Sequence, residues 1–159
     1  MTSRLDYCNV LFADCSDAVR QRLQHIHNSA AHVIHSQPVF TRATPLLQNL
    51  HWLPILKRVT CKLCVLMFNI VRGSAPSYLT DLCNICSDDH LRSASRGLFA
   101  QPRTNTKLAN KAFCVADPSA WNSLPSSIRF IDSKHSFCKQ LNYLLFLFFF
   151  LGYRFLTVK

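Results

Sequence analysis

Two closely spaced pairs of cysteines are the residues in this chain that are best suited to chemistry. A histidine follows them, so that five potential metal ligands occur in order: Cys61, Cys64, Cys83, Cys86 and His90. Two Cys-x-x-Cys pairs with about 18 residues between them match the spacing of four-cysteine zinc sites. The first pair lies within 60–67, however, where apolar residues recur at helical spacing and cysteine commonly acts as a small buried hydrophobic side chain. The sequence therefore predicts buried thiols and no metal site, with a zinc-stabilised binding module as the alternative.

A pair of adjacent aspartates, Asp88 and Asp89, is the second candidate. In polymerase active sites such a pair holds two metal ions, sits on a hairpin with apolar flanks and acts with a third carboxylate. Here Ser87 and His90 flank the pair, and no aspartate on an apolar strand precedes it at a suitable distance. The pair is therefore interpreted as a solvated turn. No catalytic residue and no cofactor is assigned, and the chain is predicted not to be an enzyme.

A basic segment is the strongest candidate for binding. Over residues 91–116 there is no acidic residue, and the cations are Arg92, Arg96, Arg103, Lys107 and Lys111. Cations without counter-charges can follow a phosphate backbone, and the interleaved Phe99 and Phe113 could stack on bases. The alternative is a solvated loop with two core phenylalanines. The segment makes RNA or DNA the predicted partner, and no small-molecule substrate is inferred.

The charge balance of the whole chain agrees with a polyanionic partner. There are 18 Lys and Arg residues against 8 acidic residues, which gives a net charge of +10. A balance of this kind favours nucleic acid, although an unselected translation product could also be basic. Residues 1–15 lack the apolar core of a secretory signal, so an intracellular location is favoured over secretion and the cysteines are expected to be thiols.

The elements that must position these residues are mostly helices. Apolar side chains at helical spacing predict helices over 3–13, 17–35, 44–51, 54–71, 76–86, 112–124 and 133–150. Ser16 is the expected N-cap of the second helix, and Gly73 is expected to end the fourth. Residues 87–111 are expected to form a loop in which 97–101 and 107–112 pair as a short hairpin. The predicted fold is therefore mainly α, a small irregular helical domain with a short β-hairpin and a hydrophobic C-terminal helix.

The C-terminal end differs in character from the rest, so residues 1–142 are assigned to one helical region and 143–159 to a hydrophobic tail. Residues 143–151 are apolar without a break. As a helix, the stretch 141–158 would be about 27 Å long, just short of a hydrocarbon core of about 30 Å. A helix packed on the domain, or an exposed apolar tail, is favoured. A small protein anchored in a membrane by this tail is the alternative.

Four phrases along the chain carry a family resemblance. They are Ser-Arg-Leu-Asp-Tyr-Cys-Asn at 3–9, Leu-His-Trp-Leu-Pro at 50–54, Ala-Pro-Ser-Tyr-Leu at 75–79 and Trp-Asn-Ser-Leu-Pro-Ser-Ser-Ile-Arg at 121–129. The stretch 22–31, Arg103 and the pair Ala112-Phe113 fit between them in order. Over residues 3–142 the chain resembles the C-terminal region of LINE-type (non-LTR) retrotransposon reverse transcriptases of the jockey-like kind, downstream of the catalytic palm.

The resemblance implies a non-catalytic piece of a polymerase, because the palm with its carboxylates is not part of the matching region. It implies that residues 3–35 belong to a helical thumb of the kind that grips a template–primer duplex. The chain departs from the family pattern at four positions: His27 replaces the usual Gln, Asn110-Lys111 replaces a Gly-x-Arg element, and Asp117 replaces a small residue before Pro118. Residues after Tyr143 do not fit the pattern.

Overall fold

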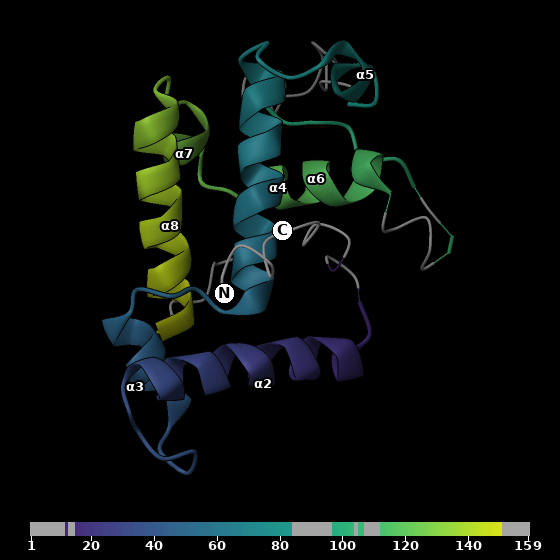
Figure 1. Cartoon of the computed structure of the whole chain (residues 1–159). Helices are drawn as coiled ribbons and strands as arrows, with labels where there is room; N and C mark the ends of the chain where they lie inside the picture. Colours follow the sequence, from purple (N-terminus) through teal and green to yellow (C-terminus); the bar gives the residue numbers. More distant parts are fainter. Residues whose placement is uncertain (1–11, 13–14, 84–96, 104, 107–111, 151–159) are drawn as a thin grey trace. The chain divides into compact units, whose positions relative to one another are not determined.

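Helices dominate the computed structural model, which describes residues 12, 15–83, 97–103, 105–106 and 112–150 (Figure 1). The helices are α2 (Asp17–Ile34), α3 (Ala43–Asn49), α4 (Ile55–Val71), α5 (Ser77–Thr80), α6 (Phe113–Asn122), α7 (Ser126–Arg129) and α8 (Lys134–Phe150). The prediction of a mainly α fold is confirmed. The expected helix over 3–13 lies outside the described residues.

The boundaries of most helices agree with the apolar spacing to within one or two residues. Ser16 is the N-cap of α2, although its side chain makes no capping hydrogen bond. Gly73, with φ of +65°, follows α4, and its N–H and that of Ser74 donate to Ile70 and Asn69, which closes the last turn. A positive φ suits glycine because it has no Cβ.

Three local expectations differ from the structure. The helix expected over 76–86 is shorter, because Leu82 and Cys83 donate to the carbonyls three residues earlier and form a turn after Thr80. Helix α7 was not predicted, since four residues after Pro125 are too short to show a period. Of the expected hairpin, the described residues show an isolated β-bridge at Phe99 but no longer strand over 97–101, and 107–111 lies outside them.

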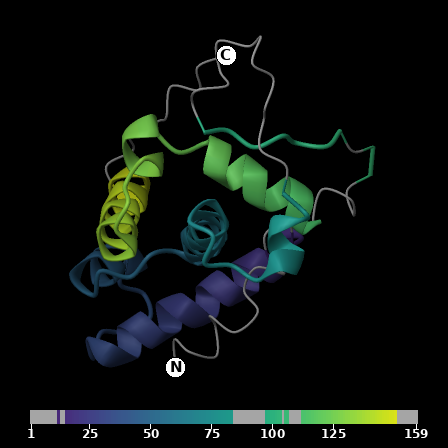
Figure 2. The ribbon, with the colours of Figure 1, turned by 90° about the horizontal axis from the view of Figure 1, so that it is seen from above.

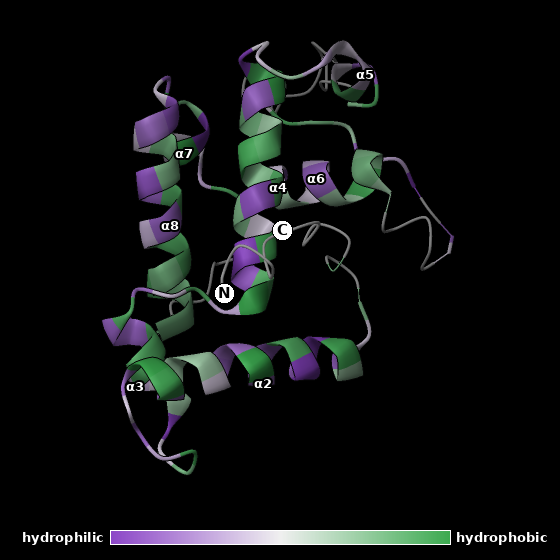
Figure 3. Cartoon of the chain, in the orientation of Figure 1, coloured by the Kyte–Doolittle hydropathy of each residue, from purple (hydrophilic) through white to green (hydrophobic). Residues whose placement is uncertain are grey.

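The described residues form two compact units. The first unit comprises 1–59 and 140–159, and the second unit comprises 60–139. Helix α8 changes character along its length, with mostly polar residues from Lys134 to Gln140 and mostly apolar residues from Leu141 onward (Figure 3).

The first unit has its core where α3 packs on the C-terminal half of α2 (Figures 1 and 2). Buried Ala31, Leu46 and Leu47 form the centre, and Leu50, Trp52 and Phe150 pack against it. The ring of His27 stacks on Trp52 with 5.0 Å between centroids. Gln24 accepts a hydrogen bond from the backbone N–H of Ile55, 3.0 Å away. Gln24 therefore satisfies one of the free N–H groups at the start of α4, which ties α4 to α2.

The second unit is built around aromatic rings. Phe68 of α4 stacks on Phe137 of α8 with 4.5 Å between centroids, and Trp121 of α6 lies 5.9 Å from Phe137. Trp121 is 1% exposed and anchors this core. At one edge, Arg72 donates to the carbonyl of Ile131 over 2.8 Å and pairs with the Asp132 carboxylate at 2.6 Å.

Candidate nucleic-acid interface

Only one of the five predicted nucleic-acid-binding cations falls within the described residues. Arg103 is exposed at the end of the segment 97–103. The other four, namely Arg92, Arg96, Lys107 and Lys111, lie outside the described residues. The interface drawn from the sequence therefore remains a prediction, with Arg103 as its one described member.

The segment that leads to Arg103 is held firmly on α6 by two residues of a single phrase. The side-chain amide of Asn122 donates to the carbonyl of Phe99 over 2.8 Å, and its Oδ1 accepts from the Phe99 N–H over 3.0 Å. Trp121 Nε1 donates to the carbonyl of Gly97 over 3.1 Å. Asn122 thus pairs with both backbone groups of Phe99, as a residue on a neighbouring β-strand would. Phe99 lies four residues before Arg103, so this pairing fixes the backbone close to that arginine.

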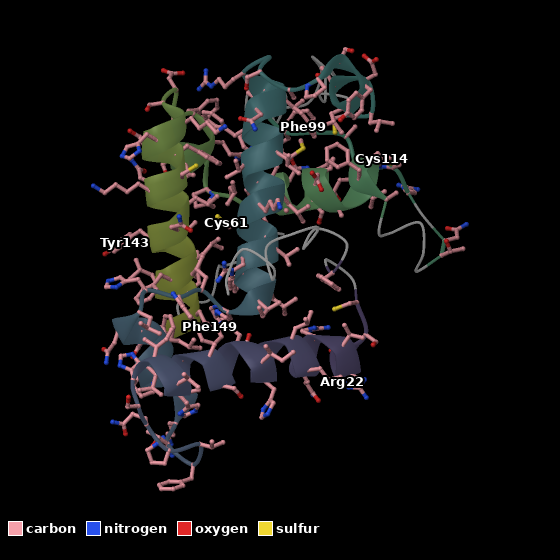
Figure 4. All side chains as sticks on the ribbon, in the orientation of Figure 1. Arg22, Cys61, Phe99, Cys114, Tyr143 and Phe149 are labelled. Carbon is pink, nitrogen blue, oxygen red and sulfur yellow. The ribbon has the colours of Figure 1, made fainter. Side chains whose placement is uncertain are left out.

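Phe99 cannot stack on bases as the sequence suggested. Its side chain is 3% exposed and meets Trp121 edge to face, with 6.4 Å between centroids. Figure 4 labels Phe99 beside α6, and both belong to the second unit. The alternative of a core phenylalanine is therefore the correct one at this position. Phe113, at the start of α6, is partly exposed.

Two further arginines of the first unit, Arg20 and Arg22, lie on α2 and line different cavities. Arg22 is exposed (Figure 4). Arg20 pairs with Asp17 at 2.6 Å and lines a cavity of about 330 Å³. The polar residues of this cavity come from three helices and include Gln21, Asn28, Thr44 and Lys57. Phe149, near the end of α8, completes the wall.

Gln24 sets the shape of this cavity. Its Nε2 donates to Asn28 Oδ1 over 2.8 Å, while its Oε1 is occupied by the N–H of Ile55. Because Asn28 uses its Oδ1 to accept from Gln24, its side-chain amide nitrogen is still able to donate to another group. Within the described part of the chain, the side chains of Gln21, Thr44 and Lys57 take part in no hydrogen bond or ion pair. A cation, two amides and a hydroxyl are therefore available around one cavity.

The cysteines behave as the sequence predicted for buried thiols. Cys64 is completely buried on α4, and Cys61 is half-buried one turn earlier. Cys83 is also buried, with its Sγ 4.0 Å from Met67 Sδ. Among the described residues no three His, Cys or Asp side chains lie close enough to hold a metal ion, and Cys86 and His90 are not among them. Both Cys64 and Cys83 are protected by burial, which raises the pKa of the Cys83 thiol to about 11 and that of Cys64 further.

An unexpected buried carboxylate lies close to these thiols. Asp117 of α6 has no exposed surface, and neither carboxylate oxygen has a hydrogen-bond partner among the described residues. Burial raises the pKa of Asp117 to about 7. In the sequence, Asp117 stands out only as a departure from a family pattern. Its neighbours three and four positions away are Cys114, Phe113, Ala120 and Trp121, and this apolar surrounding could have indicated a buried face.

The apolar tail is represented by the second half of α8. No helix in the described ranges combines the length and the apolar character that crossing a membrane requires. Within α8, Tyr143 and Phe149 are exposed, whereas Leu141 and Leu145 are buried. Residues 151–159 of the predicted tail lie outside the described residues.

Comparison of the chain with protein-family models, with curated proteins and with solved structures finds no match.

Proposed function

We propose that this chain is a non-catalytic piece of the C-terminal region of a LINE-type reverse transcriptase, and that it binds RNA or DNA through basic side chains without reading base sequence. The observation that carries the proposal is the ordered set of phrases over residues 3–142. The net charge of +10 supports the choice of a polyanionic partner.

Within each unit, residues of the phrases make packing or hydrogen-bonding contacts that support an inherited structural role. In the first unit, Gln24 and His27 of the stretch 22–31 contact Ile55 and Trp52, so this stretch packs directly on the phrase Leu-His-Trp-Leu-Pro. In the second unit, Trp121 and Asn122 hold the backbone of 97–99. Residues that pack on one another are expected to be retained or lost together.

These contacts support the proposal that the phrases have a structural role. Trp121 and Asn122 are engaged in the core or on backbone groups, and Trp52 stacks on His27. A catalytic side chain must instead reach a reacting atom in a cleft. The phrases therefore support a scaffold that presents cations, which is the role proposed here.

Fluorescence anisotropy with a labelled duplex, at several salt concentrations, tests the binding. Each phosphate contacted by Lys or Arg releases a counterion, so affinity should fall with salt at a log–log slope of roughly −3 to −5 if most of the five cations engage. Changing all five cations to Gln should flatten the slope and weaken binding to every sequence alike. The residues are Arg92, Arg96, Arg103, Lys107 and Lys111.

A matched pair of triple variants separates position from net charge. Arg103, Lys107 and Lys111 are changed to Gln in one variant, and the exposed Arg42, Lys134 and Lys139 in the other. Both variants lose the same charge. Only the first should lower the slope by about 2–3, at about 0.9 per phosphate contact. Equal losses would show that net charge alone drives binding, and strong preference for one base sequence would contradict the proposal.

A further inference from the structure

The cavity of the first unit combines features that suit one particular kind of ligand. It has a volume of about 330 Å³, which is at the small end of the range for ligand sites and far too narrow for a duplex. Its apolar wall includes Leu47 and Pro54, and no acidic residue lines it. A ligand that fits must therefore have an apolar face.

Phe149 gives this apolar wall an aromatic ring that is still accessible. The side chain is 43% exposed although it lies next to Phe150, with 4.8 Å between ring centroids at right angles. Figure 4 labels Phe149 near the end of α8, and its ring lines the same cavity as residues of α2 and α3. Stacking on such a ring is available to any flat heterocycle.

The polar groups of the cavity suit the edge of a base and a neighbouring phosphate. Gln21 offers both an amide donor and a carbonyl acceptor, and Asn28 retains a donor because Gln24 occupies its Oδ1. Lys57 contributes a cation for which the described residues provide no acidic partner. The nearby Arg20 is already balanced by Asp17. A flat ring, two hydrogen-bonding edges and one negative charge describe a nucleotide.

We infer that this cavity receives one nucleotide of a single strand, with the base on Phe149 and its phosphate beside Lys57. A single strand is required because a paired base exposes no face for stacking. This inference rests on the proposed function and adds to it a place where an unstacked base is held. Because the cavity offers both donors and acceptors, it should accept different bases.

An oligonucleotide with a base-free site tests the stacking without any change to the protein. The probes are two fluorescein-labelled single strands of about 12 nucleotides, one complete and one with several adjacent abasic positions. Their phosphates are equal, so only base contacts can distinguish them. The wild-type protein should bind the complete strand on the order of 10-fold more tightly.

Variants then assign this preference to the cavity. Phe149→Leu should abolish the preference for the complete strand, and Phe149→Tyr should keep it because the ring remains. Phe40→Leu is the control, since Phe40 is 90% exposed in the same unit and does not line the cavity. Lys57→Gln should weaken both strands, and more than the control Lys139→Gln does.

Each outcome decides one question. If the wild type binds both strands equally, the nucleotide site is excluded while electrostatic nucleic-acid binding stands. If Phe40→Leu loses the preference as fully as Phe149→Leu, the site is also excluded at this cavity. If the wild type binds neither strand nor duplex, the proposed function itself fails and the nucleotide site falls with it.

Discussion

At the scale of single residues, Asp117 is the side chain whose environment fits its chemistry least. A carboxylate without exposed surface and without a hydrogen-bond partner in the described part of the chain is costly to ionise, which is why burial raises its pKa to about 7. A small apolar side chain at this position would leave no polar atom to bury, so Asp117 has a clear physical cost.

This environment predicts an unusual dependence of stability on pH. From pH 4 to pH 7 the folded chain keeps the proton on Asp117 while the unfolded chain, with a pKa of 3.8, has released it. The folded state therefore binds more protons, and the free energy of unfolding should fall as pH rises through this window and level off above it. Asp117→Asn should remove this fall and stabilise the protein at pH 8 by about 1–3 kcal/mol.

Urea denaturation at pH 5 and pH 8 measures the effect. The control is Asp81→Asn, because Asp81 is exposed in the same unit, and this change should leave the pH dependence as it is. If Asp117→Asn and the wild type lose the same stability between the two pH values, the carboxylate is not ionising in a buried site.

The thiols lead to a second prediction at this scale. Because Cys64 lies in the core face of α4, the protein should purify without stoichiometric zinc, and chelators should leave its helical circular dichroism unchanged. Cys64→Ala should cost about 1 kcal/mol, as loss of a small buried side chain. Cys64→Ser should cost more, because a hydroxyl is then buried. Zinc at one ion per chain, lost together with the fold on chelation, would reverse this interpretation.

At the scale of elements, the segment 97–103 is linked to α6 by hydrogen bonds from the side chains of Trp121 and Asn122, and Asn122 makes two of the three. Asn122 makes both a donor and an acceptor contact with the backbone of Phe99. Phe99 also forms an isolated β-bridge, but no strand is formed in the described residues. Loss of the amide would leave the N–H and the carbonyl of a buried residue unpaired, which is more costly than the loss of a surface hydrogen bond.

Asn122→Ala should therefore lower the free energy of unfolding by about 2–3 kcal/mol. Ser119→Ala on the exposed side of the same helix should change it by less than about 0.5 kcal/mol. Hydrogen exchange gives a local measurement, since the Phe99 amide should lose its protection in the first variant alone. Retained protection would mean that another group holds this segment.

At the scale of the whole molecule, the proposed function requires binding without catalysis. Template-directed synthesis needs carboxylates that hold two metal ions, and the sequence offers only the poorly flanked pair Asp88 and Asp89. These two residues lie outside the described part of the chain. Purified protein should therefore give no extension of a primer with Mg²⁺ or Mn²⁺. Metal-dependent extension that disappears when both aspartates are changed to Ala would contradict the non-catalytic proposal.

Local patterns in the sequence predict the mainly helical fold and most helix boundaries. These features follow from local patterns, because apolar spacing, proline and glycine act on residues within a few positions of each other. The excess of basic residues and the buried character of Cys64 could be predicted in the same way. Helix α7 was not predicted because it has only four residues, too few to show apolar residues recurring at helical spacing.

Only the tertiary structure decided which distant side chains meet. Phe99 could have faced solvent or the core, and it is buried because Trp121 and Asn122, more than twenty residues later, lie against it. Asp117 is costly only because apolar residues of other segments surround it, and Phe149 lines a cavity only because α8 ends beside α2 and α3 in the first unit. Such contacts depend on how whole helices pack. A local pattern of residues does not predict which other helix a given face will contact.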